Sequence, residues 1–278
     1  MASDLPEESS DRINTNIPHP ARVYDAWLGG ENNFAVDRAA AEEGLKAFPS
    51  TVKSVRANRG FLARAVEYLV AEAGIRQFLD IGTGLPAADN THQVAQALAP
   101  ECRIAYVDND PIVLAHAEAL LQSSEPGATD YIDADLRDPA KILQQAARTL
   151  DFTQPVAVML IAVLHFIPDE SDPSRIVRTL MDAVPPGSHL VVSHTAKDIL
   201  PEEMAAFAHA MNKNSAEKVT LRDREQVTAL FHGLDLLAPG VVEVSNWRPR
   251  SADEASTPAV LWAGMARKPT WTRQSPGA

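Results

Sequence analysis

The run Phe78-Leu-Asp-Ile-Gly-Thr-Gly-Leu-Pro86 has the residue types of a nucleotide-binding turn. An apolar segment enters two glycines, and a segment of helical character follows from about Asn90. Gly82 and Gly84 lack a Cβ, so the backbone can bend tightly there and come close to a ligand. Asp80 adds a carboxylate just before them. We therefore predict that Asp80, Gly82 and Gly84 bind part of a nucleotide-like cofactor.

Polar residues stand where the next two strand-like runs end. Asp108 and Asn109 follow one run, and Asp135 and Leu136 follow the other. Ligands of open α/β sheets bind beyond the carboxyl ends of the strands. Asp108, with Asn109 beside it, is placed to accept hydrogen bonds from both hydroxyls of a ribose. Asp135 and the backbone N–H of Leu136 are placed to contact an adenine ring.

Two histidines follow later strand-like runs. His165 lies just past the fourth run, and His194 lies past the fifth. A histidine beside a reactive centre can take a proton from a hydroxyl or an amine. The alternative at both positions is a partly buried histidine with a structural role. We predict His165 as the catalytic residue, with His194 as a weaker candidate.

The chain before the glycine turn contains a break that is typical of a mobile cover. Gly29-Gly30 ends a helical segment and is followed by a polar turn. Such a segment can fold over a bound cofactor, with Tyr24 or Asn33 reaching its polar groups. Trp27 and Phe34 would then exclude water. The alternative is a helix-capping turn whose two aromatic residues belong to the core.

Short apolar runs alternate with segments of helical period from residue 75 onward. The runs are continuously apolar, which is typical of a parallel sheet covered by helices on both faces. Asp110, Asp138 and Asp172 each precede a proline and are expected to cap the helices that follow. The last two apolar runs are separated only by a loop, which predicts that they form an antiparallel pair of strands. The predicted strands cover residues 77–81, 103–107, 130–132, 156–161, 190–193, 241–245 and 259–266.

These elements divide the chain into unequal parts. The N-terminal residues are too polar to bury a core, whereas the next segment has helices that end at glycine or before proline. The expected parts are a disordered leader at 1–17, a helical cap at 18–74, a cofactor-binding α/β domain at 75–268 with a helical insertion near the substrate at 194–220, and a frayed tail at 269–278.

The composition excludes several classes of partner. The chain has 278 residues, with 25 Lys and Arg against 37 Asp and Glu, so its formal net charge is −12. An acidic field disfavours nucleic acid and anionic membrane surfaces. The single cysteine, Cys102, excludes an intramolecular disulfide and a cysteine zinc cluster, and no apolar run has the length of a membrane span. We therefore expect a cytoplasmic protein that holds no metal.

The motifs together resemble a known family. Asp80-Ile-Gly-Thr-Gly84, Asp108, Asp135-Leu136 and the run from Ala162 to Asp169 are similar to those of the class I S-adenosylmethionine (SAM)-dependent methyltransferases. The segment Pro-Ala-Arg-Val-Tyr-Asp-Ala-Trp-Leu-Gly-Gly-Glu-Asn-Asn-Phe-Ala-Val-Asp-Arg, at 20–38, narrows the similarity to a bacterial S-adenosyl methyltransferase family long described as a domain of unknown function. The resemblance spans about residues 17–269.

The resemblance implies a fold and a reaction. The fold is a Rossmann-like α/β fold with a seven-stranded, mostly parallel sheet in the order 3-2-1-4-5-7-6, helices on both faces and an N-terminal helical extension. The seventh strand would be antiparallel. SAM would be the cofactor, and its methyl group would pass to an unidentified small-molecule acceptor.

Two other functions share these residues. A nicotinamide-dependent oxidoreductase also uses a glycine turn, but Pro86 removes a backbone N–H, and Ala87 stands where a third glycine would be. A non-catalytic module of the same fold could bind SAM or its demethylated product, S-adenosylhomocysteine (SAH). Methyl transfer needs positioning more than one particular catalytic side chain, so the sequence leaves this second alternative open.

Overall fold

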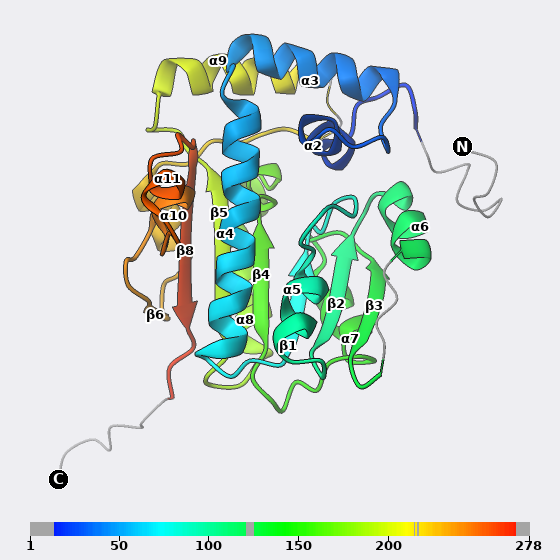
Figure 1. The fold of residues 1–278 in the computed structure, drawn as a ribbon, viewed down its shortest axis with the longest axis vertical. Coiled ribbons are helices and arrows are strands. Elements are labelled where there is room, and N and C mark those ends of the chain that lie inside the picture. The colour runs from blue at the N-terminus through cyan, green and yellow to red at the C-terminus, as the bar shows by residue number, and fades with distance from the viewer. Residues whose placement is uncertain (1–13, 121–124, 214, 216, 271–278) are drawn as a thin grey trace.

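A twisted sheet with helices on both faces forms the centre of the computed structural model, which describes residues 14–120, 125–213, 215 and 217–270 (Figure 1). The strand order is β3-β2-β1-β4-β5-β8-β6, and β7 also pairs with β8. Neighbours among β1 to β5 are parallel, whereas β8 is antiparallel to β5. The strands are β1 (Gln77–Ile81), β2 (Arg103–Asp108), β3 (Ala128–Asp133), β4 (Ala157–Ile161), β5 (His189–Thr195), β6 (Asp235–Leu236), β7 (Val242–Glu243) and β8 (Leu261–Arg267).

This topology confirms the predicted order, with one strand more than expected. β8 takes the place of the antiparallel seventh strand, and the short β6 and β7 both pair with it. The two-residue strand β6 was not predicted, because so short a segment has no hydrophobic period to read.

Two apolar cores lie on opposite faces of the sheet. Alternate residues of one strand supply them: Leu79 packs with α7, α8 and α10, whereas Phe78 packs with α4 and α5. Every residue of β1, β4 and β5 is buried, which explains the apolar runs within them, at 78–79, 157–161 and 190–192. The covering helices are α4 (Thr51–Ala71), α5 (Thr91–Leu98), α7 (Pro139–Ala146), α8 (Pro173–Asp182) and α10 (Arg224–Ala229).

Aspartate caps begin several helices, as expected. The Asp138 carboxylate accepts the Lys141 N–H at 3.1 Å, and Asp172 accepts the Arg175 N–H at 2.9 Å. Each helix then starts with a proline, whose missing N–H costs nothing at that position. The remaining short elements are α6 (Pro111–Leu120), α11 (Ala252–Ala255) and the 3₁₀ helices η1 (Leu164–Phe166), η2 (Asp169–Ser171) and η3 (Val244–Asn246).

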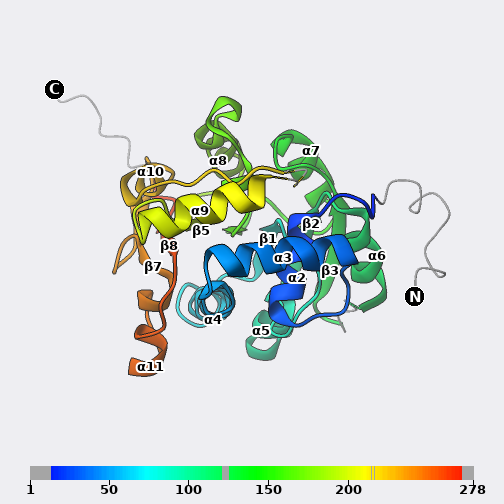
Figure 2. The ribbon, with the colours of Figure 1, turned by 90° about the horizontal axis from the view of Figure 1, so that it is seen from above.

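Three helices form a roof over the carboxyl ends of the parallel strands (Figures 1 and 2). These roof helices are α2 (Pro20–Leu28), α3 (Ala35–Ala47) and α9 (Pro201–Asn212). α3 packs against both α2 and α9, and the rings of Trp27 and Phe207 lie 5.9 Å apart. Gly44 permits this approach, because a Cβ there would lie 2.9 Å from the Trp27 ring.

The observed helices and strands can be compared with the expected division of the chain into parts. Within 18–74, α2 and α3 belong to the roof, but α4 runs along one face of the sheet and supplies its core. Among the described residues of the insertion at 194–220, the helix is Pro201–Asn212, whereas His194 and Thr195 continue β5 and pair with Trp262 and Leu261. Residues 1–13 of the expected leader and 271–278 of the expected tail lie outside the described residues.

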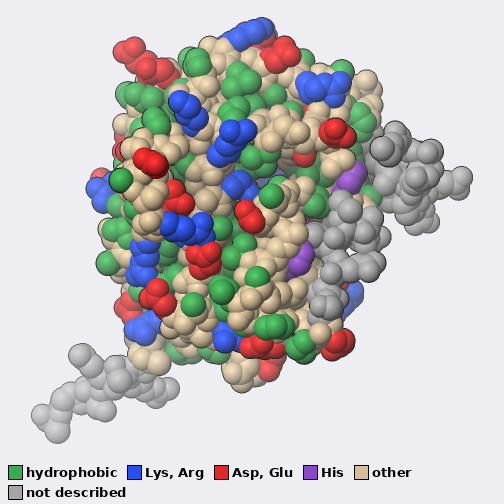
Figure 3. Space-filling view, in the orientation of Figure 1, with side chains coloured by type: hydrophobic (Ala, Val, Ile, Leu, Met, Phe, Trp, Pro, Cys, Tyr) green, Lys and Arg blue, Asp and Glu red, His purple; other side chains and the backbone are tan. Residues whose placement is uncertain are grey.

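The surface charge, the helices and the metal-binding side chains can be compared with the expectations for nucleic acid, membrane and metal. On the face drawn in Figure 3, basic side chains lie among acidic ones rather than apart from them. Within the described ranges, no helix combines the length and apolar character needed to cross a bilayer. The same ranges contain no cluster of three or more His, Cys, Asp or Glu side chains suited to a metal.

Candidate functional site

One pocket lies between the carboxyl ends of the strands and the roof helices. It spans the point between β1 and β4 where the strand order reverses, which is the usual ligand site of open α/β sheets. The predicted site residues that line this pocket are Tyr24, Asp80, Gly82, Gly84, Asp108, Asn109, Asp135, Leu136 and His165.

The glycine turn forms the wall of the pocket after β1. Gly82 and Gly84 have φ angles of +76° and +67°, which residues with a Cβ rarely adopt. A Cβ on Gly82 would lie 2.4 Å from the Val163 side chain, so the turn also needs glycine for packing against the loop after β4. A Cβ on Gly84 would meet no protein atom within 4 Å, and Gly84 therefore borders open space.

Asp108 closes this turn from the end of β2. Its carboxylate oxygens accept the Gly84 N–H at 2.8 Å and the Asp110 N–H at 3.0 Å. Burial raises the pKa of Asp108, although these two backbone hydrogen bonds oppose the shift. Each carboxylate oxygen has a second lone pair. Asp108 can therefore hold the turn and still accept hydrogen bonds from a ligand.

Asp80 lies deeper in the pocket, at the end of β1. One carboxylate oxygen accepts the Thr91 hydroxyl at 2.6 Å. Burial raises the pKa of Asp80 to about 6, despite the Thr91 hydrogen bond and the positive charge of Arg59. Arg59 itself donates to the carbonyls of Ala88 and Asp89, at 2.6 and 2.9 Å, and so ties the glycine loop to α4. A ligand cation beside Asp80 would favour its charged form.

The residues after β3 form the far end of the pocket. Asp135 accepts both the backbone N–H of Arg137, at 2.8 Å, and its guanidinium, at 2.9 Å. Arg137 also pairs with Glu217 at 2.6 Å. Leu136 is buried, and the Asn109 amide donates to Asp135 at 3.5 Å. The predicted adenine contact at Asp135 thus shares its carboxylate with an ion-pair network.

His165 lies in η1, just after β4. The loop begins at Ala162, whose φ of +53° is strained for a residue with a Cβ. The Ala162 N–H donates to the Ser193 hydroxyl at 3.0 Å, which ties the loop to β5. The ring of His165 is buried, and its Nδ1 has no hydrogen-bond partner within the described part of the chain. Burial, with His194 and Arg222 nearby, holds the pKa of His165 well below its usual value, so the ring is neutral.

Arg222 holds the loop that carries His165. Its guanidinium donates to the carbonyls of Leu164 and Ile167, at 3.1 and 2.8 Å, and pairs with Asp169 at 2.6 Å. It also donates to Nε2 of His194 at 2.8 Å, so the Nδ1–H of that ring must donate to the carbonyl of its neighbour Thr195. His194 is fully buried with both nitrogens engaged, and it does not line the pocket. Its role is therefore structural.

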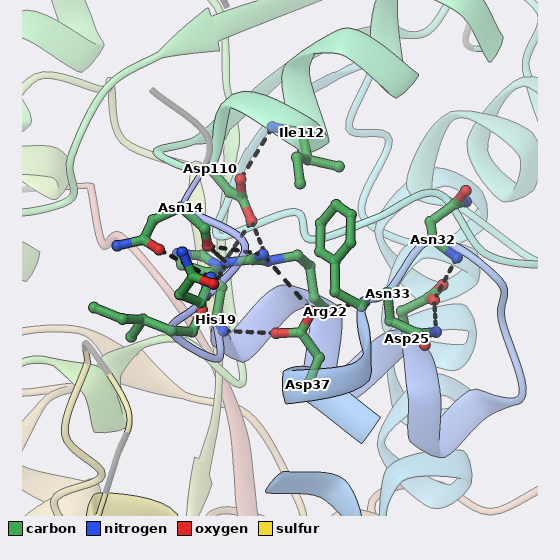
Figure 4. Close-up of polar contacts among 12 residues, drawn as sticks. Asn14, His19, Arg22, Asp25, Asn32, Asn33, Asp37, Asp110 and Ile112 are labelled. Carbon is green, nitrogen blue, oxygen red and sulfur yellow. Dashed lines mark hydrogen bonds and ion pairs between the residues drawn. The ribbon is translucent and has the colours of Figure 1, made fainter. Parts of the chain in front are cut away.

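A buried charge network fastens the roof to the strand that carries Asp108. The Asp110 carboxylate lies 3.0 Å from Nδ1 of His19 and 3.3 Å from Nε of Arg22 (Figure 4). Asp37 accepts the backbone N–H of His19 and lies 3.7 Å from Arg22, which joins α3 to α2. Burial alone would raise the pKa of Asp110, but His19 and Arg22 outweigh it and lower the pKa.

Asn33, which was predicted to contact the cofactor, is not among the residues that line the pocket. Its amide donates instead to the Asp25 carboxylate, at 2.8 Å, and to the Gly30 carbonyl, at 2.9 Å (Figure 4). The polar turn therefore folds back onto α2. Asp25, the α2 residue that the turn bonds, lines the pocket. Tyr24 does line the pocket, and its hydroxyl bridges the Asn58 amide and the Val55 carbonyl.

Comparison with known proteins places the chain in a family. The model of a family described as S-adenosyl methyltransferase matches residues 6–269. The chain belongs to this methyltransferase family. None of the curated proteins compared matches it.

Solved structures agree with the family in their fold. A protein of the duf574 family from Streptomyces avermitilis is 41% identical to this methyltransferase, covers 92% of this chain and 99% of its own, and superposes with a TM-score of 0.88. A candidate methyltransferase from Thermobifida fusca is 39% identical over 91% of this chain and 96% of its own, with a TM-score of 0.84. An O-methyltransferase family protein from Burkholderia thailandensis, 15% identical over 81% of this chain and 61% of its own, has a TM-score of 0.50 and shares the fold.

The pocket of this methyltransferase fits SAM. The cofactor has a ribose, an adenine and a cationic methionine part. Asp108 keeps lone pairs for ribose hydroxyls, Asp80 can become an anion beside an ammonium group, and Gly84 leaves open space beside both. The family shows SAM-dependent methyl transfer, and the pocket is compatible with SAM.

Several pocket residues escaped the sequence reasoning. Ser54 and Asn58 lie one turn apart on α4, and both line the pocket. Their spacing, as polar residues on a buried helix face, was a readable signal. His19, which also lines the pocket, pairs with Asp110, which is distant in sequence, and no local pattern reveals such a pair.

Proposed function

We propose that this methyltransferase methylates a small molecule inside the pocket, beside His165. The observation that carries the proposal is that one pocket runs from Gly84 and Asp108 to His165 beneath the roof helices. A ligand held there is covered by α2, α3 and α9, and a folded macromolecule would have to displace them.

In this proposal, different residues of the chain hold different parts of SAM. SAM, when bound, supplies a methyl group on a cationic sulfur, which keeps the bonding electrons when the methyl leaves. Asp108 and the Gly82–Gly84 turn hold the nucleoside, with Asn109, Asp135 and Leu136 at the adenine. Asp80 balances the cationic end, and Tyr24 closes the pocket from α2. The roof excludes water from the path of the acceptor.

We propose that His165 contacts the methyl acceptor. Its ring is neutral because burial disfavours the protonated form, so one ring nitrogen keeps a lone pair at neutral pH. That lone pair can accept the hydrogen of an acceptor O–H or N–H and orient the reacting atom. Methyl transfer removes the positive charge of the sulfonium from the pocket. Protonation of the His165 ring then costs less electrostatic energy, because that positive charge is no longer nearby.

Labelled-methyl transfer tests this proposal. The enzyme is incubated with methyl-tritiated SAM and either the small-molecule filtrate or the macromolecular fraction of a cell extract. We expect label in the filtrate, and loss of that label with Asp108→Ala. Incorporation confined to protein or nucleic acid would contradict the proposal. A parallel calorimetric titration should detect SAH but not NAD.

A further inference from the structure

The pocket has two halves of different character. The half above β1, β2 and β3 carries the charged groups Asp80, Asp108 and Asp135. The other half lies above β4, β5 and β8, under α9 and the first turns of α4. We call it the acceptor chamber, and the residues that define it are Phe48, Ser54, His165, Met204, Phe207 and Val260.

The acceptor chamber is mainly apolar, although Arg59 on α4 and the Arg137–Glu217 pair beside the His165 loop line the same pocket. Phe48, Met204, Phe207 and Val260 form one buried cluster, against which Trp27 packs. Among the described residues, none of the lining side chains from α9, from the start of β8 or from the first turns of α4 is charged. Aromatic rings and methionine favour a flat apolar ligand, and a ligand charge there would lose hydration without gaining a partner.

Ser54 differs from the other polar side chains that line the pocket from this part of α4. A buried serine inside a helix usually bonds the carbonyl one turn earlier. The Ser54 side chain is 2% exposed, yet its Oγ has no hydrogen-bond partner in the described chain. Its neighbours on the same helix face are satisfied, since Thr51 donates to the Phe48 carbonyl and Asn58 bonds both Tyr24 and Ser193.

Ser54 and His165 are held on one rigid frame. The Ser193 hydroxyl accepts the N–H of Ala162, where the His165 loop begins, and donates to Asn58 at 2.6 Å. Asn58 lies one helical turn from Ser54 and anchors that part of α4. Two residues that line the chamber thus each have a buried polar atom with no partner among the described residues, Ser54 Oγ and His165 Nδ1. Buried polar atoms are normally satisfied, which points to a ligand that satisfies them.

We propose that the acceptor chamber binds an uncharged, mainly apolar molecule through a hydroxyl group, and that Ser54 and His165 together recognise that hydroxyl. A hydroxyl has one donor and two acceptor positions, so it can donate to His165 and accept from Ser54 at once. An amine that is charged at neutral pH lacks an acceptor lone pair, and a carboxylate lacks the donor. Ser54 is therefore the specificity residue for a neutral alcohol or phenol. This inference rests on the proposed function.

Binding of three matched probes tests the inference without turnover. The holoprotein, saturated with SAH, is titrated with p-cresol, toluene and p-toluate, and binding is followed by backbone-amide NMR shifts. We expect p-cresol to bind more tightly than toluene, by about fivefold for each of its two net hydrogen bonds, and p-toluate to bind most weakly. Ser54→Ala, which leaves the hydrogen bond to His165, should reduce the preference for p-cresol over toluene about fivefold. Ser50→Ala, the same change at a position outside the pocket, should keep it.

The outcomes separate this inference from the proposed function. SAH binding together with a Ser54-dependent preference for p-cresol supports the inference. SAH binding without p-cresol binding, with equal toluene binding or with an unchanged preference in Ser54→Ala overturns the inference alone. Failure of SAH to bind overturns the proposed function as well.

Discussion

Asp80→Asn should make the unliganded protein more stable and its cofactor binding weaker. Burial raises the pKa of Asp80 from 3.8 to about 6. Because this folded-state pKa exceeds the unfolded value, protonated Asp80 stabilises the fold below pH 3.8, and that contribution is lost as the pH rises through about 6. A shift of about 2 units corresponds to about 3 kcal/mol, so the neutral amide should raise the free energy of unfolding at pH 7 by up to that amount. Asparagine can still accept the Thr91 hydroxyl.

Cofactor binding should respond in the opposite direction. If the ammonium group of SAH binds ionised Asp80, the carboxyl that titrates at about 6 is about 9% ionised at pH 5 and about 91% at pH 7. The dissociation constant of SAH should then fall about tenfold between these pH values in the wild type and stay nearly constant in Asp80→Asn. Calorimetry across this pH range and urea unfolding at pH 7 measure the two effects. Equal pH slopes in both proteins, or a less stable Asp80→Asn, would refute the reasoning.

Three further perturbations test other parts of the site. Asp108→Ala should weaken SAH binding by about 2 kcal/mol, roughly thirtyfold, whereas Asp138→Ala, at a helix cap outside the pocket, should leave calorimetric affinity unchanged. The backbone amides of residues 24–34 should exchange hydrogen with solvent more slowly with saturating SAH than without it. Exchange rates that do not change with SAH would show that this segment is a fixed part of the core. Gly82→Ala should lower the urea midpoint more than Gly84→Ala, because both require a positive φ but only the former adds a Cβ 2.4 Å from another side chain. Equal midpoints would contradict that packing.

The sheet, and the acidic residues that its strand ends bring to one pocket, could be predicted because local patterns specify them. Continuously apolar runs marked the strands, and the parallel order aligned their carboxyl ends. Asp80, Asp108 and Asp135 therefore reach one pocket, although 55 residues of sequence separate the first from the last. The glycine turn was readable for the same reason, since positive φ angles are a local requirement.

The roof and the acceptor chamber could not be predicted in the same way. Nothing local to Asn33 indicates that its amide folds back onto Asp25, because several donors and acceptors in that turn could pair. His194 lies after an apolar run and looked catalytic, yet its nitrogens are engaged by Arg222 and by the carbonyl of Thr195. The contact with Arg222 depends on the tertiary structure, because 28 residues of sequence separate the two partners.

The structure of the SAH complex tests the central claim most directly. We predict SAH along the carboxyl ends of β1, β2 and β3, with both ribose hydroxyls on the Asp108 carboxylate, the ammonium group toward Asp80 and the sulfur facing the acceptor chamber. SAH bound outside this pocket, or lying in it with its adenine in the acceptor chamber, would contradict the account.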